Sequence, residues 1–457
     1  MHRFEWTCHP EAAAFVAREV AAGLAGNAFA ADLARRMAVE TSTRLVDWVD
    51  HLRIPERGRL RAELSALGFT PRADATGVFD HDGGMFPALV LSRVEGPALA
   101  IKVESVADFV AAHGLSAEIL GPPLGPFRSA RVEGVGSTFA AVERRGYRGF
   151  EPFPSTLARA GRLTPQSARD TLKARELWQV RPRNLREDDR AFDAAEAALS
   201  RMIELVGPDV ACHLAFEVER DYWQARNSAA RVQKARQDRL GLGWANHDHH
   251  TFRSSRRMFP RLMQLLHRMG FQRREHFHAG AQAGWGAQIL EQPTTGIVVF
   301  ADLDLAPDEA DRDFAVEALP ELPVPNTVGL WVGLHGESIL SAGMHHLEAQ
   351  FDFEALRSDL DGLGVSTMKP FSDYPFLRQA FTTGERWPVE PWRLDKLLGE
   401  GRIDADQLAR FLADGAIGSH LENLQRADGY KGFNQRAVGV ILAATDPRLN
   451  PLLASPG

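Results

Sequence analysis

The residues of this chain best suited to chemistry are histidines in short, strand-like segments. His51 lies in VDHLRIP, His249 in HDHHTFR and His346 in GMHHLEAQ. Neutral imidazole nitrogens bind divalent transition metals, and a carboxylate can complete such a site while leaving positions open for other ligands. Side chains alternate along a strand, so only one of two consecutive histidines, such as His249 and His250, can face a single site. The pattern predicts a site for one divalent metal ion.

These histidines begin three copies of one pattern. The copies run from Asp50 to Phe69, from Asp248 to Phe271 and from His345 to Val365. In each copy the histidine is followed by an amphipathic helix with apolar residues three and four apart, and the helix ends at a glycine. Glycine suits this position because the residue after a helix commonly adopts a positive φ. Strand-like segments follow, so the predicted unit is a strand, a helix and further strands.

The remaining segments predict how these units are joined. Residues 9–45 indicate two helices that break near Gly26 and Asn27, and residues 165–240 are again helical in pattern. We therefore expect five regions: N-terminal helices, a first βαβββ-like module, a helical connector, a second module, and a third module with C-terminal helices. Their expected ranges are 1–43, 44–160, 161–243, 244–320 and 321–457.

A βαβββ module with a histidine on its first strand resembles the vicinal-oxygen-chelate superfamily, which includes glyoxalases and extradiol dioxygenases. Residues 245–305 and the closing segment RADGYKGFNQRAVGVILAATDP are similar to one branch, the DUF1338 family. That family contains the 2-oxoadipate dioxygenase/decarboxylase that forms 2-hydroxyglutarate. The resemblance implies an α+β fold in which repeated βαβββ modules form a cupped sheet around a metal, with N-terminal and connecting helices.

The resemblance also implies a ligand set of two histidines and one glutamate. His249 matches the histidine of the family's DH-x-x-x-R strand motif, and Arg253 matches its arginine. His249 is therefore the first expected ligand. A planar guanidinium suits a carboxylate, so we expect Arg253 to clamp the substrate.

Two sets of partners for His249 remain open. In the favoured set, His51 is the second histidine and Glu143, in STFAAVERRGYRGF, is the carboxylate. In the rival set, His346 and Glu422 complete the site in the family's own order. The rival lacks support from local pattern, because SHLENLQRADGY, which contains Glu422, is helical in pattern rather than strand-like.

Composition restricts the function classes. The chain has 457 residues, a net charge of −7 and two cysteines. The negative charge argues against a general binder of nucleic acid or anionic membranes, and two cysteines form neither a disulfide framework nor a cysteine zinc cluster. No secretory signal or membrane-spanning run is evident, so a cytoplasmic protein is expected. The P-loop, dinucleotide-binding, H-E-x-x-H and G-x-S-x-G motifs are absent from the sequence.

The sequence thus predicts a metal-dependent dioxygenase/decarboxylase that acts on a small 2-oxo carboxylic acid, with Fe(II) as the expected cofactor and Mn, Zn or Ni as alternatives. Its partners would be a small carboxylate substrate and O2, without nucleic acid or membrane; the oligomeric state is left open. Two alternatives are a non-oxidative metal-dependent isomerase or lyase on the same scaffold and a catalytically degenerate ligand-binding protein.

Overall fold

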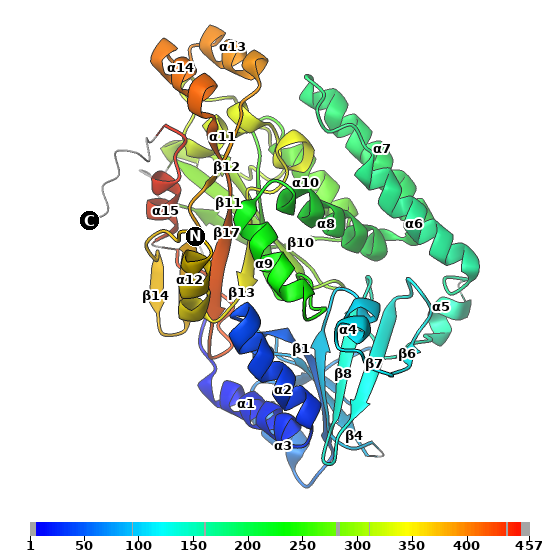
Figure 1. The fold of residues 1–457 in the computed structure, drawn as a ribbon. Helices are drawn as coiled ribbons and strands as arrows, with labels where there is room; N and C mark the ends of the chain where they lie inside the picture. Colours follow the sequence, from blue (N-terminus) through cyan, green and yellow to red (C-terminus); the bar gives the residue numbers. More distant parts are fainter. Residues whose placement is uncertain are drawn as a thin grey trace.

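The fold consists of two large mixed β-sheets joined by a bundle of helices (Figure 1). The computed structural model describes residues 6–93, 95–159, 161–279, 284–309, 311–435 and 437–448. The first sheet lies in the N-terminal part of the chain and the second in the C-terminal part. In the described ranges, no helix is both long and apolar enough to cross a bilayer.

The first sheet contains two βαβββ units rather than one. Its strand order is β2-β3-β4-β1-β5-β8-β7-β6, and β1 pairs antiparallel with β5 to join the units. The sequence pattern predicts a single module over 44–160, because the first strand of the second unit, ALAIK, lacks the histidine that identifies the others. The elements are β1 (Val49–Pro55), α3 (Leu60–Ala66), β2 (Thr70–Pro71), β3 (Val78–Asp80), β4 (Ala88–Ser92), β5 (Ala98–Lys102), α4 (Val106–Ala112), β6 (Ile119–Leu120), β7 (Phe127–Glu133) and β8 (Thr138–Arg144).

The second sheet repeats this plan. Its order is β10-β11-β12-β9-β13-β17-β15-β14, with β16 paired to β17, and β9 pairs antiparallel with β13. The expected fold class, α+β with repeated βαβββ modules, is therefore confirmed. The elements are β9 (His247–Arg253), α10 (Phe259–Arg268), β10 (Gln272–His278), β11 (Trp285–Gln292), β12 (Ile297–Asp304), β13 (His346–Gln350), α12 (Phe353–Gly362), β14 (Ser372–Tyr374), β15 (Leu377–Phe381), β16 (Glu385–Trp387) and β17 (Ala416–Arg426).

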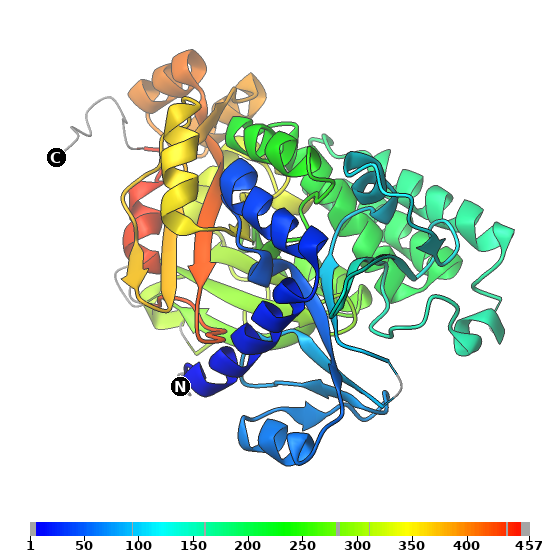
Figure 2. The same cartoon turned by 60° about the horizontal axis from the view of Figure 1, so that its bottom comes forward.

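Helices cover one face of each sheet and leave the other face to a cavity. In the first sheet Leu52, Leu99 and Phe139 face a core that they share with the N-terminal helices, while His51 alternates to the opposite face. Two helices, α1 (Pro10–Ala25) and α2 (Ala28–Arg36), break at Gly26 and Asn27 as expected, and the Asn27 side chain caps the second by accepting from the Ala30 amide. These N-terminal helices are the blue ribbons in Figure 2.

Further helices connect and flank the sheets. The connector comprises α5 (Ser155–Arg159), α6 (Pro165–Gln179), α7 (Asp188–Val206), α8 (Pro208–Gln224) and α9 (Ser228–Asp238). The C-terminal region adds α11 (Thr327–His335), α13 (Pro391–Gly399), α14 (Ala405–Asp414) and α15 (Val438–Ala444). Short turns of other helix types are η1 (Met37–Thr41), η2 (Leu45–Trp48), η3 (Pro307–Glu309) and η4 (Ser338–Ala342).

A buried charge cluster fastens the connector to the second sheet's side of the molecule. Glu219 on α8 accepts hydrogen bonds from Arg181 Nη2 at 2.7 Å and Arg183 Nη2 at 2.6 Å. The same arginines donate to the carbonyls of Ile339 and Leu340 in η4, which precedes β13. Removing one partner of a buried ion pair typically costs about 3–5 kcal/mol, so this cluster holds the approach to β13 in place.

Candidate metal centre

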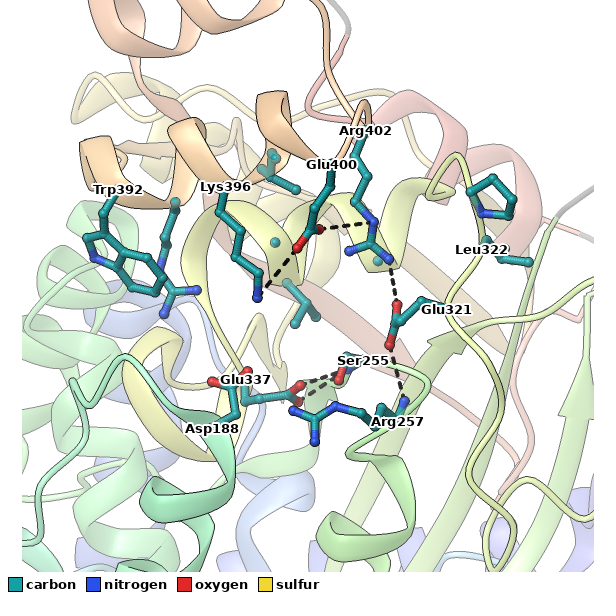
Figure 3. Close-up of a pocket in the computed structure, with 16 residues that line it drawn as sticks. Asp188, Ser255, Arg257, Glu321, Leu322, Glu337, Trp392, Lys396, Glu400 and Arg402 are labelled. Carbon is teal, nitrogen blue, oxygen red and sulfur yellow. Dashed lines mark hydrogen bonds and ion pairs between the residues drawn. The ribbon is translucent and has the colours of Figure 1, made fainter.

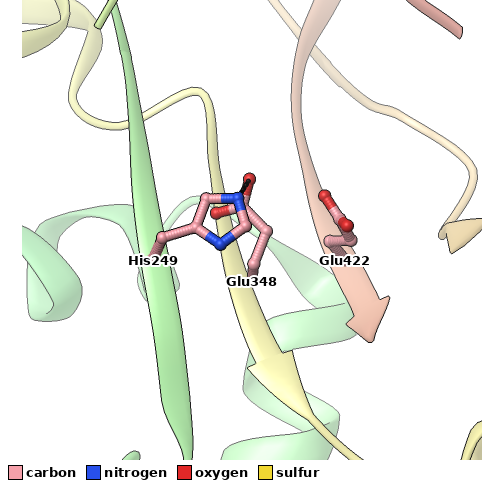
Figure 4. A group of neighbouring side chains, drawn as sticks. All are labelled: His249, Glu348 and Glu422. Carbon is pink, nitrogen blue, oxygen red and sulfur yellow. Dashed lines mark ion pairs between the residues drawn. The ribbon is translucent and has the colours of Figure 1, made fainter. Parts of the chain in front are cut away.

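Three neighbouring strands bring a histidine and two glutamates together. His249 on β9 lies opposite Glu348 on β13, and Glu348 lies opposite Glu422 on β17. Directly opposed residues in a sheet have Cα atoms about 4.5–5.5 Å apart, so their side chains meet when they share a face. Figure 4 shows these three side chains converging from the three strands. Alternation along β13 also places His346 on the face of Glu348.

His249, Glu348 and Glu422 lie close enough together to hold one cation, and His346 contacts both glutamates. His249 Nε2 lies 3.1 Å from Glu348 Oε1, and His346 Nε2 lies 2.5 Å from the same oxygen. His346 Nε2 is 3.9 Å from Glu422 Oε2. One ligand atom from each of His249, Glu348 and Glu422 lies within 4.8 Å of the others, and all four side chains are buried. Imidazole nitrogens and carboxylate oxygens form a donor set suited to Fe, Mn, Zn or Ni.

The charges at this cluster also favour a cation. Burial and the neighbouring Glu348 carboxylate raise the pKa of Glu422 well above its usual range. Burial alone would raise the pKa of Glu348 too, but His249 and His346 outweigh it and lower that pKa to about 2. Glu348 Oε2 is buried without a hydrogen-bond donor among the described residues. A divalent ion would relieve the repulsion between the two carboxylates and satisfy this oxygen.

A hydrogen-bonded chain orients the His249 ring. Its Nδ1 donates to Asp248 Oδ1 at 2.8 Å, and Arg426 holds both oxygens of Asp248 through Nε and Nη2, at 2.9 and 3.0 Å. Arg426 Nη1 also donates to the carbonyl of Gly432. A carboxylate on the far nitrogen fixes the tautomer of a metal-binding histidine and leaves its other nitrogen free for the metal. Asp248 sits where the β9–β13 register shifts, and this irregularity turns its side chain toward the ring.

The cavity over this cluster is small and largely aromatic. Its volume is about 60 Å³. The aromatic residues in its wall are Trp285, Phe300, Phe371, Phe381 and Phe433. On the C-terminal side, Ile441 and Leu442 of α15 also line it. Such a lining limits water and strengthens electrostatic interactions with whatever occupies the cavity.

The guanidinium of Arg253 lies at the same cavity, and among the described residues some of its hydrogen-bond donors have no acceptor. Arg253 follows His249 by four residues on β9, shares its face, and is only 1% exposed. Its Nε and Nη1 have no hydrogen-bond acceptor within the described part of the chain, and its guanidinium lies 5.5 Å from the centre of the Trp331 ring. Asp302 is opposite it in register on β12, and burial raises the pKa of that carboxyl to about 7. A buried arginine with free donors is suited to a ligand carboxylate.

The structure does not bring together the favoured set of His51, Glu143 and His249. His51 is on β1 of the first sheet and His249 on β9 of the second. Glu143 on β8 points to the opposite face from His51, because its neighbour Val142 lines the cavity of His51 and side chains alternate. Glu143 instead accepts a hydrogen bond from the Val106 amide at the start of α4, at 2.9 Å. Its role in this structure is to hold that helix.

The structure does bring together the rival residues, His249, His346 and Glu422. Glu422 lies in the middle of β17, an eleven-residue strand, and not in a helix as its local pattern indicates. Leu421 and Leu424, three apart, are both fully buried because this central strand is covered on both faces. Burial on both faces removes the alternation by which an exposed strand is recognised.

Sequence reasoning missed Glu348. The available signal was the spacing His346-x-Glu348, which places an imidazole and a carboxylate on one face of a strand. A second signal was the spacing of Glu422 and Arg426, four apart, since Arg426 reaches back to the aspartate that holds His249.

A second polar pocket of about 490 Å³ lies between α11, α13 and the loop after β9 (Figure 3). Four of its charged side chains pair with one another: Arg402 with Glu321 at 2.8 Å, and Lys396 with Glu400 at 4.0 Å. Glu337 accepts from the Ser255 amide, and burial raises its pKa to about 8. Among the described residues the group that could hold a metal ion is the cluster on β9, β13 and β17, so this pocket is the weaker candidate for a metal site.

Comparison with known proteins finds solved structures of low sequence identity and low TM-score. No protein-family model and no curated protein matches the chain. A mutant of 4-hydroxymandelate synthase from Streptomyces coelicolor is 14% identical, with 88% of this chain and 98% of that chain covered and a TM-score of 0.29. Methylmalonyl-CoA epimerase from Mycobacterium tuberculosis is 13% identical, with 40% and 89% covered and a TM-score of 0.23.

A third solved structure is YdcJ from Shigella flexneri, an uncharacterised protein that includes the domain DUF1338. It is 13% identical, with 56% of this chain and 73% of that chain covered and a TM-score of 0.23. The paired βαβββ units of the present structure agree with the fold that the sequence resemblance implies. At these identities and TM-scores the comparisons carry no argument about function, which must be argued from the site.

Proposed function

We propose that this protein is a metal-dependent oxygenase that acts on a small 2-oxo carboxylic acid, with Fe(II) as the expected metal. The observation that supports this most is the convergence of His249, His346, Glu348 and Glu422 in a largely aromatic cavity that also contains Arg253. We assign the metal to His249, His346 and Glu422, the two-histidine, one-carboxylate set that leaves positions open for substrate. When bound, the metal supplies those positions and the redox chemistry that couples O2 to loss of CO2.

The chain's own residues have three tasks in this proposal. Asp248 and Arg426 orient the His249 ring. Glu348 adds a second carboxylate, so that the two negative charges of Glu348 and Glu422 match a divalent cation. It does so in a buried environment where Coulomb interactions are strong. Its contact with the Thr251 hydroxyl, at 2.8 Å, keeps it in this position.

Arg253 orients the substrate. His249 and Arg253 are four apart on one strand, so their Cα atoms are separated by roughly 13 Å at about 3.3 Å per residue. A long guanidinium that reaches back along the strand shortens this gap to the length of a small acid. A 2-oxo acid with a second carboxylate would place its 2-oxo end at the metal and its distal carboxylate on Arg253. The aromatic wall excludes water from the reacting atoms.

Metal content and oxygen consumption test the proposal. Purified protein should contain about one Fe, Mn, Zn or Ni per chain, removable by a chelator. The metal-loaded protein should consume O2 with a 2-oxo dicarboxylic acid and release CO2. Turnover that continues under anaerobic conditions would replace the oxygenase with a lyase or isomerase. Failure to bind metal after reconstitution would remove the enzyme proposal altogether.

A further inference from the structure

The cavity on the concave face of the first sheet, lined by His51 and here called the first cup, is built on the same plan as the metal centre. The cavity of the metal centre, lined by His249, is called the second cup. His51 Nδ1 donates to Asp50 Oδ2 at 2.7 Å. Arg144 holds both oxygens of Asp50 through Nε and Nη2, at 2.6 and 2.8 Å, and donates through Nη1 to the carbonyls of Tyr147 and Gly149. This is the arrangement of Asp248, His249 and Arg426, reproduced in a sheet far from them in the chain.

The strand registers make the correspondence residue by residue. His51 pairs with Ala100 on β5, with a shift of register at Asp50, just as His249 pairs with Glu348 with a shift at Asp248. Ala100 in turn pairs with Ala140 on β8, as Glu348 pairs with Glu422. The first cup therefore has three alanines where the second sheet has its other donors: Ala98 for His346, Ala100 for Glu348 and Ala140 for Glu422.

At three other positions the first cup has two arginines and a serine where the second cup has uncharged residues. On β7, Arg131 pairs with Ala140 and Ser129 with Val142, so they take the places of Phe381 and Gln379 on β15. On β1, Arg53 pairs with Ala98 in the place that Thr251 takes opposite His346. These replacements all line the cavity of the first cup.

The two cups therefore carry opposite charge. With histidines counted as neutral, the charged residues that line the first are Arg53, Arg131 and Glu95, and those that line the second are Arg253, Asp302, Glu348 and Glu422. The formal charge of the lining is thus +1 in the first cup and −2 in the second. Loss of the carboxylates disfavours a metal ion, and the added arginines favour an anion.

The first cavity can accept such a ligand. Its volume is about 180 Å³, roughly the space that six water molecules occupy in the liquid. Arg53 is engaged by Glu95 and the Gly96 carbonyl. For Arg131 and for the Ser129 hydroxyl, the described part of the chain offers no hydrogen-bond partner. Phe127 and Phe150 form apolar walls, and the Phe150 ring lies 4.8 Å from that of His51.

We propose that the cup of the first sheet is a second ligand site that binds a small oxyanion, a carboxylate or a phosphate, through Arg131, Ser129 and Arg53. The guanidinium of Arg131 and the hydroxyl of Ser129 supply donors from one strand, and Arg53 adds charge from the facing strand. In this cup arginines provide the positive charge that a metal would provide in the other. The proposal does not depend on the metal assignment, because none of its residues belongs to the second sheet.

Calorimetric titration of the full-length protein, as purified, with sodium phosphate and with sodium succinate tests this site. Binding of either ion that Arg131→Gln weakens supports it, and the tighter of the two identifies phosphate or carboxylate as the natural class. Arg131→Gln should weaken binding by roughly tenfold to a hundredfold, the range for one lost hydrogen bond to a charged group. Arg131 is exposed, so this variant should melt at the temperature of the wild type.

Two control variants localise the binding. Arg190→Gln removes an exposed arginine of α7 and should leave the affinity unchanged. Arg253→Lys alters the second cup and should leave the phosphate affinity unchanged, while it can weaken only the succinate that binds at the second cup. The proposal is overturned if neither ion binds, if Arg131→Gln binds like the wild type, or if Arg253→Lys alone abolishes binding. Metal content, measured on the same samples, reports on the proposed function separately.

Discussion

In both sheets an aspartate at a strand irregularity holds a histidine ring, and an arginine from a neighbouring strand holds the aspartate. Around this shared frame the two sheets differ completely in the residues that would meet a ligand. The first sheet carries alanines and arginines there, while the second carries a histidine and glutamates.

This contrast separates two roles of the aspartate and the arginine: stabilising the fold and orienting the histidine. The aspartate and arginine also tie strand ends to the following loop, through the carbonyls of Gly149 in one sheet and Gly432 in the other. They persist in the first sheet, where the other metal donors are missing, so they stabilise the fold as well as orienting a ligand. In the proposed assignment, metal binding also needs the donors of β13 and β17.

The largest effect is expected from removing the histidine of each cup in turn. His249→Ala should lose the bound metal and all turnover, because it removes a donor from a site of few ligands. His51→Ala should retain the metal and the activity. Elemental analysis of the two folded variants checks this. Full metal occupancy in His249→Ala, or its loss in His51→Ala alone, would reverse the assignment of the two cups.

A second prediction concerns a variant in which the first cup receives metal donors of the second. The triple variant Ala98→His, Ala140→Glu and Arg131→Phe places two donors of the second cup in the first and removes a repelling charge. Its metal content should rise from about one to about two equivalents per chain. Adding His51→Ala to this variant should return the content to about one. A triple variant that folds but stays at one equivalent would show that the register correspondence is insufficient for binding.

Substitution of the two aspartates separates their effect on the orientation of the histidine ring from their effect on the stability of the fold. Asp248→Asn should lower metal affinity by about 10- to 100-fold, the usual effect of removing the partner that orients a metal-binding histidine. Asp50→Asn should leave metal affinity unchanged. Both variants should melt at lower temperature, because each leaves without its charged partner an arginine that is partly buried (Arg144) or buried (Arg426). Competition with a fluorescent chelator measures the affinities; equal affinities in the two variants would contradict the prediction.

A smaller effect is expected at Arg253. Arg253→Lys should keep the metal but weaken substrate binding by about 1–3 kcal/mol, since lysine cannot form the two parallel hydrogen bonds of a guanidinium. Inhibition by a dicarboxylic acid that resembles the substrate measures this loss. If Arg253 were only structural, the variant would lose thermal stability while inhibitor affinity per folded chain stayed the same.

The smallest effect concerns pH. Burial raises the pKa of Asp302 to about 7, so this carboxyl is neutral below pH 7 and charged above it. A charged Asp302 competes with substrate for Arg253, and substrate affinity should fall several-fold as pH rises through about 7. The same shift means that the contribution of Asp302 to stability fades between about pH 4 and pH 7. Asp302→Asn should flatten the binding profile; an unchanged profile would exclude this competition.

The sequence by itself determined several parts of the molecule. The histidine segments, the amphipathic helices that end at glycine and the repeated βαβββ plan follow from local pattern. His249 and Arg253 could be placed on one face because their spacing within a single strand fixes their relative direction. Such features depend on residues that are neighbours in the chain, and their physical causes are local.

Only the tertiary structure decided which residues form the site. Whether His249 meets Glu143 or Glu422 depends on which strands pair and in what register, and those strands lie far apart in the chain. The second unit of the first sheet cannot be recognised from the histidine pattern, because its strands carry alanines where the other units carry polar residues. Glu422 was misread as helical because β17 is buried on both faces and shows no alternation. Strand pairing and burial are properties of the packed molecule, so the position of the site emerged only from the fold.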